Sequence, residues 1–280
     1  RKIVMLETKN GITFATFDIL NKTGTVTAAV SARTGGISRP PFDSLNMSFS
    51  SGDVPEHIRE NRKRCLEALG IDPVRIISCN QVHGIHIEAV GKDDCGRGAL
   101  NRQEAIADCD GLMTHEVGVP LTMNFADCTP LLFYDPVRRV IALSHGGWRG
   151  AARNIGAVTL KNMHDAYGTK PADVLAAIGP TIHDCCFEVG GDVLQAFSTV
   201  LPEAEVRRLS RDKENGKYYF DLPGANKALL LQTGILPEHL EDAGICTGCR
   251  EELFYSYRKA SRRKEKTGRH MAVMELKEYA

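Results

Sequence analysis

The stretch from residue 121 to residue 150, LTMNFADCTPLLFYDPVRRVIALSHGGWRG, decides the fold class. It contains three short apolar segments, at 121–125, 130–134 and 139–143, separated by polar and turn-forming residues as β-strands are. A helix is predicted from Arg149, directly after two glycines. Strands this close together, followed by a helix, indicate a mixed α/β domain with a central sheet.

Strands and helices continue to alternate on both sides of this stretch. Asp53 and Glu56 are expected to form a capping box for a helix that has Pro55 in its first turn and ends at Gly70. We interpret residues 1–280 as one α/β domain, a central sheet flanked by helices. The other predicted strands are 25–31, 74–78, 85–90, 112–113, 174–178 and 271–276, and the other helices are 149–167, 192–200 and 222–232.

Composition limits the classes of partner. Lys plus Arg and Asp plus Glu each number 35 in 280 residues, so charge gives no argument for nucleic acid or an acidic membrane surface. No apolar run is long enough to span a bilayer. The basic run 258–266 is interpreted as a solvated loop. Nine cysteines, an odd number in a chain of this size, do not suggest a disulfide framework, so we expect a reducing, cytoplasmic compartment.

Three segments place a candidate metal ligand beside a predicted strand and a tight turn: QVHG at 81–84, ADCTP at 126–130 and SHGGWR at 144–149. One thiolate and two imidazoles, from Cys128, His83 and His145, suit Zn²⁺. Three protein ligands would leave a fourth position open for water, as in catalytic zinc sites. The spacing alone is not a zinc signature, and a hydrogen-bonded structural histidine is the commoner alternative.

Other polar motifs have two readings each. The glycines before Arg149 and the helix start there form a candidate anion site, or simply a tight turn. Asp110 either orients a metal-bound histidine or makes a turn. Residues 44–48, which include Asn46, either contact a sugar or base or only shape the loop.

The remaining cysteine motifs are ambiguous. Cys246 and Cys249 form a CxxC, which is half of a structural zinc site, a redox pair, or two buried thiols. No second CxxC exists, so the last interpretation is favoured. The adjacent Cys185 and Cys186 are expected to serve packing.

A series of short motifs covers nearly the whole chain: SLN 44–46, QVHG 81–84, DGLMT 110–114, ADCTP 126–130, HGGWRG 145–150, IGP 178–180, CFEVG 186–190, CT 246–247 and TGR 267–269. In their order, and above all in the pairing of Ala-Asp-Cys with His-x-Gly-Trp-Arg-Gly, they resemble the laccase-domain family. That family is also called the polyphenol oxidase or purine nucleoside phosphorylase family.

The resemblance implies one α/β domain, similar to the fold of cysteine-dependent hydrolases, with zinc bound by His83, Cys128 and His145. It also implies phosphorolysis of adenosine, inosine, guanosine and methylthioadenosine, and deamination of adenosine. Copper, which the older laccase name suggests, is not expected, because a laccase needs several copper ions and many histidines in His-x-His pairs. Gly146 departs from the family, which more often has Ala there, and is expected to loosen the turn slightly.

In the first hypothesis the partners are purine nucleosides and phosphate, bound by a monomer or homodimer, without nucleic acid or membrane. Phosphate near Arg149 would attack the ribose C1′, or a zinc-activated hydroxide would attack C6 of adenine. Asp127 is the candidate for proton transfer. Asn46, Gln81 and Arg149 are the candidates for substrate binding.

Two alternatives use the same residues. In a metal-independent cysteine hydrolase, with cell-wall peptides as one substrate class, Cys128 would be the nucleophile and His145 its base. In a zinc-stabilised binding module no substrate is turned over.

Overall fold

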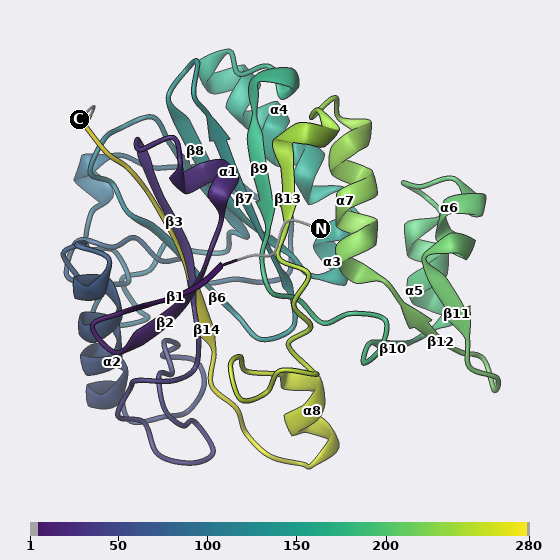
Figure 1. The fold of residues 1–280 in the computed structure, drawn as a ribbon, viewed down its shortest axis with the longest axis horizontal. Coiled ribbons are helices and arrows are strands. Elements are labelled where there is room, and N and C mark those ends of the chain that lie inside the picture. The colour runs from purple at the N-terminus through teal and green to yellow at the C-terminus, as the bar shows by residue number, and fades with distance from the viewer. Residues whose placement is uncertain (1–4, 279–280) are drawn as a thin grey trace.

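The computed structural model describes residues 5–278, which form a mixed α/β domain (Figure 1). This confirms the predicted mixed α/β class, and the strands are divided among three sheets of six, five and three strands. The six-stranded sheet has the order β13-β9-β7-β8-β5-β4. Its strands are β4 (Ile87–Ala89), β5 (Gly111–Thr114), β7 (Thr129–Asp135), β8 (Val140–Gly146), β9 (Leu175–Ile178) and β13 (Leu240–Asp242).

An antiparallel hairpin of β7 and β8 forms the middle of this sheet. Every residue of both strands is buried, which explains why each segment is apolar along nearly its whole length. The register pairs Thr129 with Gly146 and Pro130 with His145. The hairpin therefore brings the residue before β7, Cys128, to the end of β8 where His145 lies.

The five-stranded sheet has the order β1-β2-β3-β14-β6, and β14 runs along β3 through the centre of the molecule (Figure 1). Residues 126–128 connect β6 of this sheet to β7 of the other one. One apolar core cluster includes residues from both sheets, among them Met123, Leu132, Leu143 and Ala272. The strands are β1 (Met5–Lys9), β2 (Ile12–Thr16), β3 (Val26–Ser31), β6 (Leu121–Phe125) and β14 (His270–Leu276).

Two predicted helices differ in detail from the observed ones. Helix α2 (Pro55–Ala68) begins at the expected proline, but Val54 is its N-cap and no side chain caps it. Asp53 instead accepts hydrogen bonds from Ser38 and Asn46, so the predicted capping box was wrong. The helix predicted at 149–167 is divided into α3 (Trp148–Ala151) and α4 (Ile155–Tyr167).

The division falls at Asn154, which has a φ of 56° and cannot continue a right-handed helix. Its side chain accepts a hydrogen bond from the backbone of Ala157 and so caps α4. An asparagine that suits both a left-handed backbone and an N-cap explains the break that apolar periodicity alone did not reveal.

The three-stranded sheet and helices α5 and α6 form a small lobe at one side (Figure 1). A second apolar cluster, with Phe197 and Phe220 among its members, fills it. The remaining elements are α1 (Asp18–Asn21), β10 (Glu188–Gly190), α5 (Gly191–Phe197), α6 (Glu203–Arg208), β11 (Ser210–Asp212), β12 (Lys217–Phe220), α7 (Leu222–Gln232), α8 (Tyr257–Arg262) and the 3-10 turns at Lys92–Asp94, Pro171–Asp173 and Pro237–His239.

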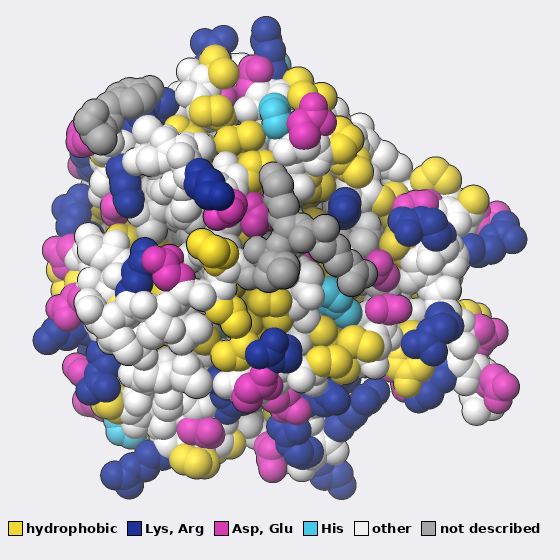
Figure 2. All heavy atoms as spheres, in the orientation of Figure 1, with side chains coloured by type: hydrophobic (Ala, Val, Ile, Leu, Met, Phe, Trp, Pro, Cys, Tyr) yellow, Lys and Arg dark blue, Asp and Glu magenta, His cyan; other side chains and the backbone are white. Residues whose placement is uncertain are grey.

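Two further expectations are corrected. Residues 74–78 are not a strand, because only isolated bridges at Ile77 and Cys79 are formed there. The basic run 258–266 is not simply a loop, because its first part belongs to α8 and Arg258 is half-buried. Acidic and basic side chains are interspersed over the face in Figure 2, as the zero net charge suggests. Among residues 5–278, no helix combines the length and apolar character needed to cross a bilayer.

Arg62 on α2 gives a stability test of the fold. It is 3% exposed and donates to the carbonyls of Met47, Gly98 and Ala99, which joins α2 to two loops. We expect Arg62→Met to lower the free energy of unfolding by about 3 kcal/mol, because buried carbonyls lose their donors. Urea denaturation monitored by circular dichroism measures this.

Arg64→Met on the same helix is the matched control, because Arg64 forms only an exposed pair with Glu60. Its effect is expected to stay within about 0.5 kcal/mol. Equal effects of the two substitutions would contradict the role assigned to Arg62.

Candidate metal centre and its pocket

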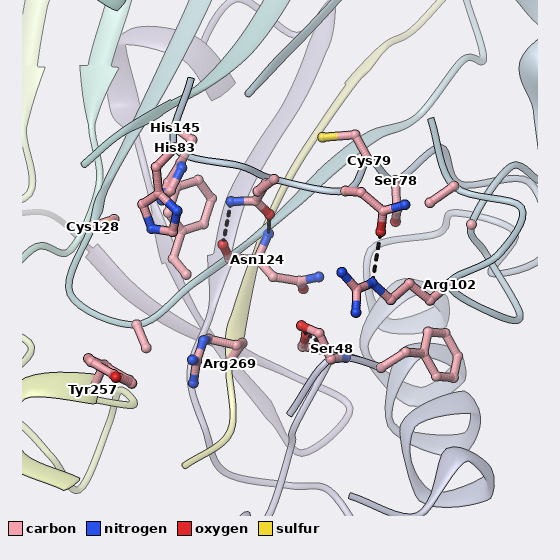
Figure 3. A pocket seen from close by; sticks show the side chains of 18 of the residues that line it. Ser48, Ser78, Cys79, His83, Arg102, Asn124, Cys128, His145, Tyr257 and Arg269 are labelled. Atoms are coloured by element: carbon pink, nitrogen blue, oxygen red, sulfur yellow. Dashed lines mark hydrogen bonds between the residues drawn. The ribbon is translucent and has the colours of Figure 1, made fainter. Parts of the chain in front are cut away.

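Three side chains from distant parts of the chain meet at one end of a pocket (Figure 3). The ligand atoms of His83, Cys128 and His145 all lie within 4.8 Å of one another. His145 lies inside β8, Cys128 precedes β7, and His83 lies in a loop, so only part of the expected strand-end pattern is observed. The structure nevertheless brings together the three residues that the sequence singled out.

Asp110, which precedes β5, holds two of these residues in place. Its carboxylate is fully buried and accepts a hydrogen bond from His145 Nδ1 at 2.9 Å. It also accepts the backbone N–H groups of Val82, His83 and Gly84 at 3.1, 2.9 and 2.7 Å. Burial opposes ionisation, yet the hydrogen bond from His145 and those from the backbone keep the pKa of Asp110 below its usual value.

This carboxylate therefore performs the orienting role considered for it from the sequence. It leaves Nε2 of His145 available as a ligand and fixes the loop of His83, whose φ is 60°. A left-handed conformation at a histidine needs such local support.

Cys128 and His145 also influence each other's ionisation. Burial favours the neutral thiol, but the adjacent His145 and His83 outweigh it and lower the pKa of Cys128 to about 6. Burial likewise disfavours the imidazolium, but the Cys128 thiolate and the hydrogen bond to Asp110 raise the pKa of His145 to about 9. A thiolate is the form that binds a metal or acts as a nucleophile.

The donor set fits one zinc ion. Sulfur and imidazole nitrogen are its preferred ligands, and three of them leave one tetrahedral position, here facing the pocket. The approach of the thiolate depends on Gly147, because a Cβ at that position would lie 2.8 Å from Cys128 Sγ. Any larger residue there would push the sulfur away.

The pocket beside the three ligands has a volume of about 460 Å³. Four arginines line it: Arg62, whose guanidinium is engaged by backbone carbonyls, and Arg102, Arg149 and Arg269. Figure 3 shows Arg269 and Tyr257 below the histidines and Arg102 at the opposite end. Among the described lining residues there is no Asp or Glu, so the pocket favours an anion.

Two of the three predicted substrate-binding residues line this pocket. Arg149 is exposed, and its guanidinium lies 4.5 Å from the centroid of the Trp148 ring. Gln81 exchanges two hydrogen bonds of 2.9 Å with the backbone of Asn124 and so joins the His83 loop to β6. Its amide is therefore engaged within the protein.

Asn46 does not reach the pocket. It is fully buried, donates to Ser51 and Asp53, and accepts from the backbone of Ser48 and Arg269. Its contacts fix the loop, the second of the two readings of residues 44–48. Within that loop, Ser48 is the residue that lines the pocket.

Asp127 does not have the surroundings of a proton-transfer group. It is 7% exposed, and its carboxylate accepts from Thr247 Oγ1, Ser256 Oγ and the backbone of Arg258 at 2.6, 3.1 and 2.6 Å. Burial raises its pKa, and these donors partly offset that effect. These contacts indicate that Asp127 positions the Cys128 turn, and the catalytic role expected from its place next to Cys128 stays a prediction.

The predicted anion site at the start of a long helix is also corrected. Helix α3 has one turn, so its dipole adds little, and the cation at this place is the Arg149 side chain. Gly146 belongs to β8 rather than to the turn. A Cβ there would lie 2.9 Å from Oδ1 of the buried Asn226, so this glycine makes room for Asn226.

Among the lining residues that sequence reasoning did not assign to the site are Arg102, Asn124, Tyr257 and Arg269. Arg269 had a signal, because it ends the TGR motif at 267–269. Its half-buried guanidinium donates to the carbonyls of Thr267 and Gly268. Arg102 and Tyr257 lie in polar segments without a pattern, and only the folded chain brings them here.

Fold and site together define an α/β protein with a group of three candidate metal ligands in an arginine-lined pocket. The family model described as multi-copper polyphenol oxidoreductase laccase matches residues 27–277. The chain belongs to this family.

Several relatives are similar over most of their length. YlmD of Geobacillus stearothermophilus, named a purine nucleoside phosphorylase, is 37% identical over 251 residues, 90% of each chain. YfiH of Escherichia coli is also named a purine nucleoside phosphorylase. It is 33% identical over 235 residues, 84% of this chain and 88% of that protein. The crystal structure of the Geobacillus YlmD has a TM-score of 0.91 and 34% identity, and covers 99% of this chain and 100% of that one.

The copper in the family description requires several histidine-rich centres. Among the described residues, two groups of three or more candidate ligands lie close enough to share an ion, and one of them contains histidine. That group offers two imidazoles and one thiol, donors that suit one zinc ion and are too few for a multi-copper cluster.

Asp110→Asn tests the orienting carboxylate. The amide keeps the shape but loses the negative charge that supports His145, so zinc affinity is expected to fall about 10- to 100-fold. Competition with a chromophoric chelator measures the affinity. Asp108→Asn is the control, because Asp108 is exposed and asparagine tolerates its φ of 43°. An unchanged affinity in Asp110→Asn would refute the assignment.

Alkylation of metal-free protein tests the ion pair. Because the pKa of Cys128 is lowered to about 6, its thiolate dominates above that pH. The iodoacetamide reaction at Cys128 is expected to rise with a midpoint near pH 6 rather than near 9. Peptide mass spectrometry separates Cys128 from the exposed Cys185 and Cys249, and saturating zinc should protect Cys128. A midpoint above pH 8 would contradict the proposed electrostatics.

Proposed function

We propose that this chain is a zinc-dependent purine nucleoside phosphorylase that cleaves adenosine, inosine, guanosine and methylthioadenosine. The observation that carries the proposal is the composition of the pocket, in which the candidate metal ligands and four arginines line one cavity without a carboxylate among the described lining residues. The names of the relatives support the same class of reaction.

His83, Cys128 and His145 hold the metal in this proposal, and Asp110 keeps His145 in the correct tautomer. Zinc bound there supplies a Lewis acid next to the substrate. The low pKa of Cys128 ensures that the thiolate is present at neutral pH.

The arginines bind phosphate in the proposed reaction. Guanidinium groups suit phosphate oxygens, and a pocket without a lining carboxylate does not repel them. A phosphate oxygen forms a bond to the ribose C1′ while the bond from C1′ to the purine nitrogen breaks. The electron pair of that bond leaves with the purine, which takes up a proton, and the sugar product is ribose 1-phosphate.

The remaining pocket suits a nucleoside. Its volume of about 460 Å³ lies within the usual range for small-molecule sites, about 300–1,000 Å³. Tyr257 and Phe125 supply aromatic surface, and Ser48 and Asn124 supply polar groups. Oδ1 of Asn124 is buried without a hydrogen-bond partner, which makes this amide a candidate for recognition of the substrate.

Deamination of adenosine is a second activity that the metal centre supports, because three ligands leave one position open. Zinc deaminases also use a nearby glutamate for proton transfer. Neither Asp127 nor any other carboxylate supplies it from the described lining residues, so phosphorolysis is favoured.

A cysteine hydrolase remains the alternative because of one specific feature. Cys128, His145 and Asp110 form a thiol, imidazole and carboxylate series with a lowered pKa at the thiol. The same sulfur cannot bind zinc and attack a substrate at once, so metal dependence separates the two proposals.

The described cysteines are all free thiols, which supports a reducing, cytoplasmic compartment.

The decisive assay incubates zinc-loaded protein with adenosine, with and without inorganic phosphate, and separates the products by chromatography. Adenine and ribose 1-phosphate are expected only with phosphate, while inosine reports deamination. Arg269→Gln is expected to raise the KM for phosphate at least 10-fold, because a guanidinium contact is lost. Arg207→Gln, on the surface of α6, is the control.

Two results would overturn the proposal. One is the absence of both adenine and inosine with metal-loaded protein. The other is a hydrolysis that persists in metal-free protein and is abolished by alkylation of Cys128, which would establish the cysteine hydrolase instead.

A further inference from the structure

Four cysteines outside the pocket form a second cluster: Cys185, Cys186, Cys246 and Cys249. Their Sγ atoms all lie within 4.8 Å of one another. Three of the separations are 3.5, 3.4 and 3.5 Å, for Cys185 with Cys246, Cys185 with Cys249, and Cys186 with Cys249. Two of the thiols are buried and two are exposed.

The sequence shows only half of a four-cysteine site, the CxxC at 246–249. Because the sequence contains no second CxxC, packing is the favoured interpretation of these thiols from the sequence alone. The structure supplies the missing pair from the adjacent Cys185 and Cys186, in the turn before β10. The bridge between Thr181 and Cys246 and the hydrogen bond from the backbone of His183 to Cys246 Sγ fix the two segments together.

We propose that these four cysteines bind a second, structural zinc ion. Four thiolates with Zn–S bonds of about 2.3 Å place their sulfurs about 3.8 Å apart in a tetrahedron. The observed separations are close to this value. Binding displaces the thiol protons to solvent.

Local packing brings the four sulfurs close, and the geometry leaves little room for other side chains. At Gly248, between the two cysteines of the CxxC, a Cβ would lie 2.9 Å from Cys186 Cβ and 3.0 Å from its Sγ. The turn can therefore approach Cys186 only with glycine at this position. Such an approach is costly for packing alone but is required if both segments share one ion.

Electrostatics agrees with a site that needs a cation. Burial, together with the neighbouring thiols, raises the pKa of Cys186 to about 12 and that of Cys185 further. Hydrogen bonds from Cys185 and Cys186 lower the pKa of Cys249. A divalent cation between the four sulfurs would lower the pKa of every thiol in the cluster.

This second ion differs from the first in function. Four protein ligands close the coordination sphere and leave no position for a substrate, which is typical of structural zinc. The ion would join the turn before β10 to the segment leading into α8. Thr247, inside the CxxC, donates to Asp127, so the same ion also supports the turn that carries Cys128.

Metal analysis of the whole chain tests the proposal, with a non-thiol reductant present throughout. The wild-type protein is expected to contain two zinc ions per chain, and Cys185→Ser with Cys249→Ser one. His83→Ala is expected to lose the other ion and retain the four-cysteine one. Failure of the proposed function would therefore not affect this result. Cys95→Ser, outside both clusters, should keep two ions.

Cys249→His separates loss of a ligand from misfolding. A Cys₃His site also binds zinc, so this variant should keep the second ion that the double serine variant loses. In cobalt-substituted protein, the sulfur-to-cobalt charge-transfer absorption should fall strongly in the double serine variant while circular dichroism is unchanged. One zinc ion in both the wild-type and the double variant would overturn the proposal. A disulfide among the four cysteines in wild-type protein purified under the same conditions would also overturn the proposal.

Discussion

The register of the β7–β8 hairpin is the constraint on which the site depends. Pro130 lies opposite His145, and the residue just before β7 therefore meets the end of β8. In a hairpin the turn fixes the register, and here Asp135 accepts hydrogen bonds from the backbone of Val137 and Arg138 within the turn at 136–139. This turn thus sets the separation of a thiol and an imidazole that lie 17 positions apart in the chain.

Two buried carboxylates then hold the candidate metal ligands together. Asp110 joins the His83 loop to His145, and Asp127 joins the Cys128 turn to the segment before α8 and to its first turn. Each carboxylate accepts several hydrogen bonds, which compensates for its removal from water. Asp127 has a φ of 85°, so its side-chain contacts also support an unfavourable backbone conformation. The three candidate ligands are therefore held close together by the protein itself, which is the preorganisation that the proposed metal centre would need.

Much of the fold could be predicted because burial leaves a clear pattern. The strand at 121–125 and the helix at 222–232 have the bounds expected from their apolar residues. The number of sheets could not be predicted, because the partners of each strand depend on long-range pairing that periodicity does not encode. The break at Asn154 and the missing strand at 74–78 likewise depend on single backbone conformations and on neighbouring loops.

The site shows the same division between local and long-range information. The three ligands stand next to recognisable turns, whereas Arg102 and Tyr257 reach the pocket only through the folding of polar loops. Asp127 is singled out in the sequence because its neighbour is a candidate ligand, while its hydrogen-bond donors lie 120 to 131 positions further along. Its position beside Cys128 in the sequence indicates that Asp127 belongs to the site. The direction of its side chain, toward Thr247, Ser256 and Arg258, indicates a positioning role.

Asp127 also connects the three-ligand cluster, which contains Cys128, with the four-cysteine cluster. Its backbone continues into Cys128, and its carboxylate accepts a hydrogen bond from Thr247 between Cys246 and Cys249. The three-ligand cluster faces a pocket, whereas the four-cysteine cluster presents sulfur alone and has no remaining position for a substrate. One cluster therefore has the geometry for chemistry and the other the geometry for support. The hydrogen bond from Thr247 to Asp127 therefore links the four-cysteine cluster to Cys128. A change in the four-cysteine cluster would reach the Cys128 sulfur through this hydrogen bond and the adjoining backbone.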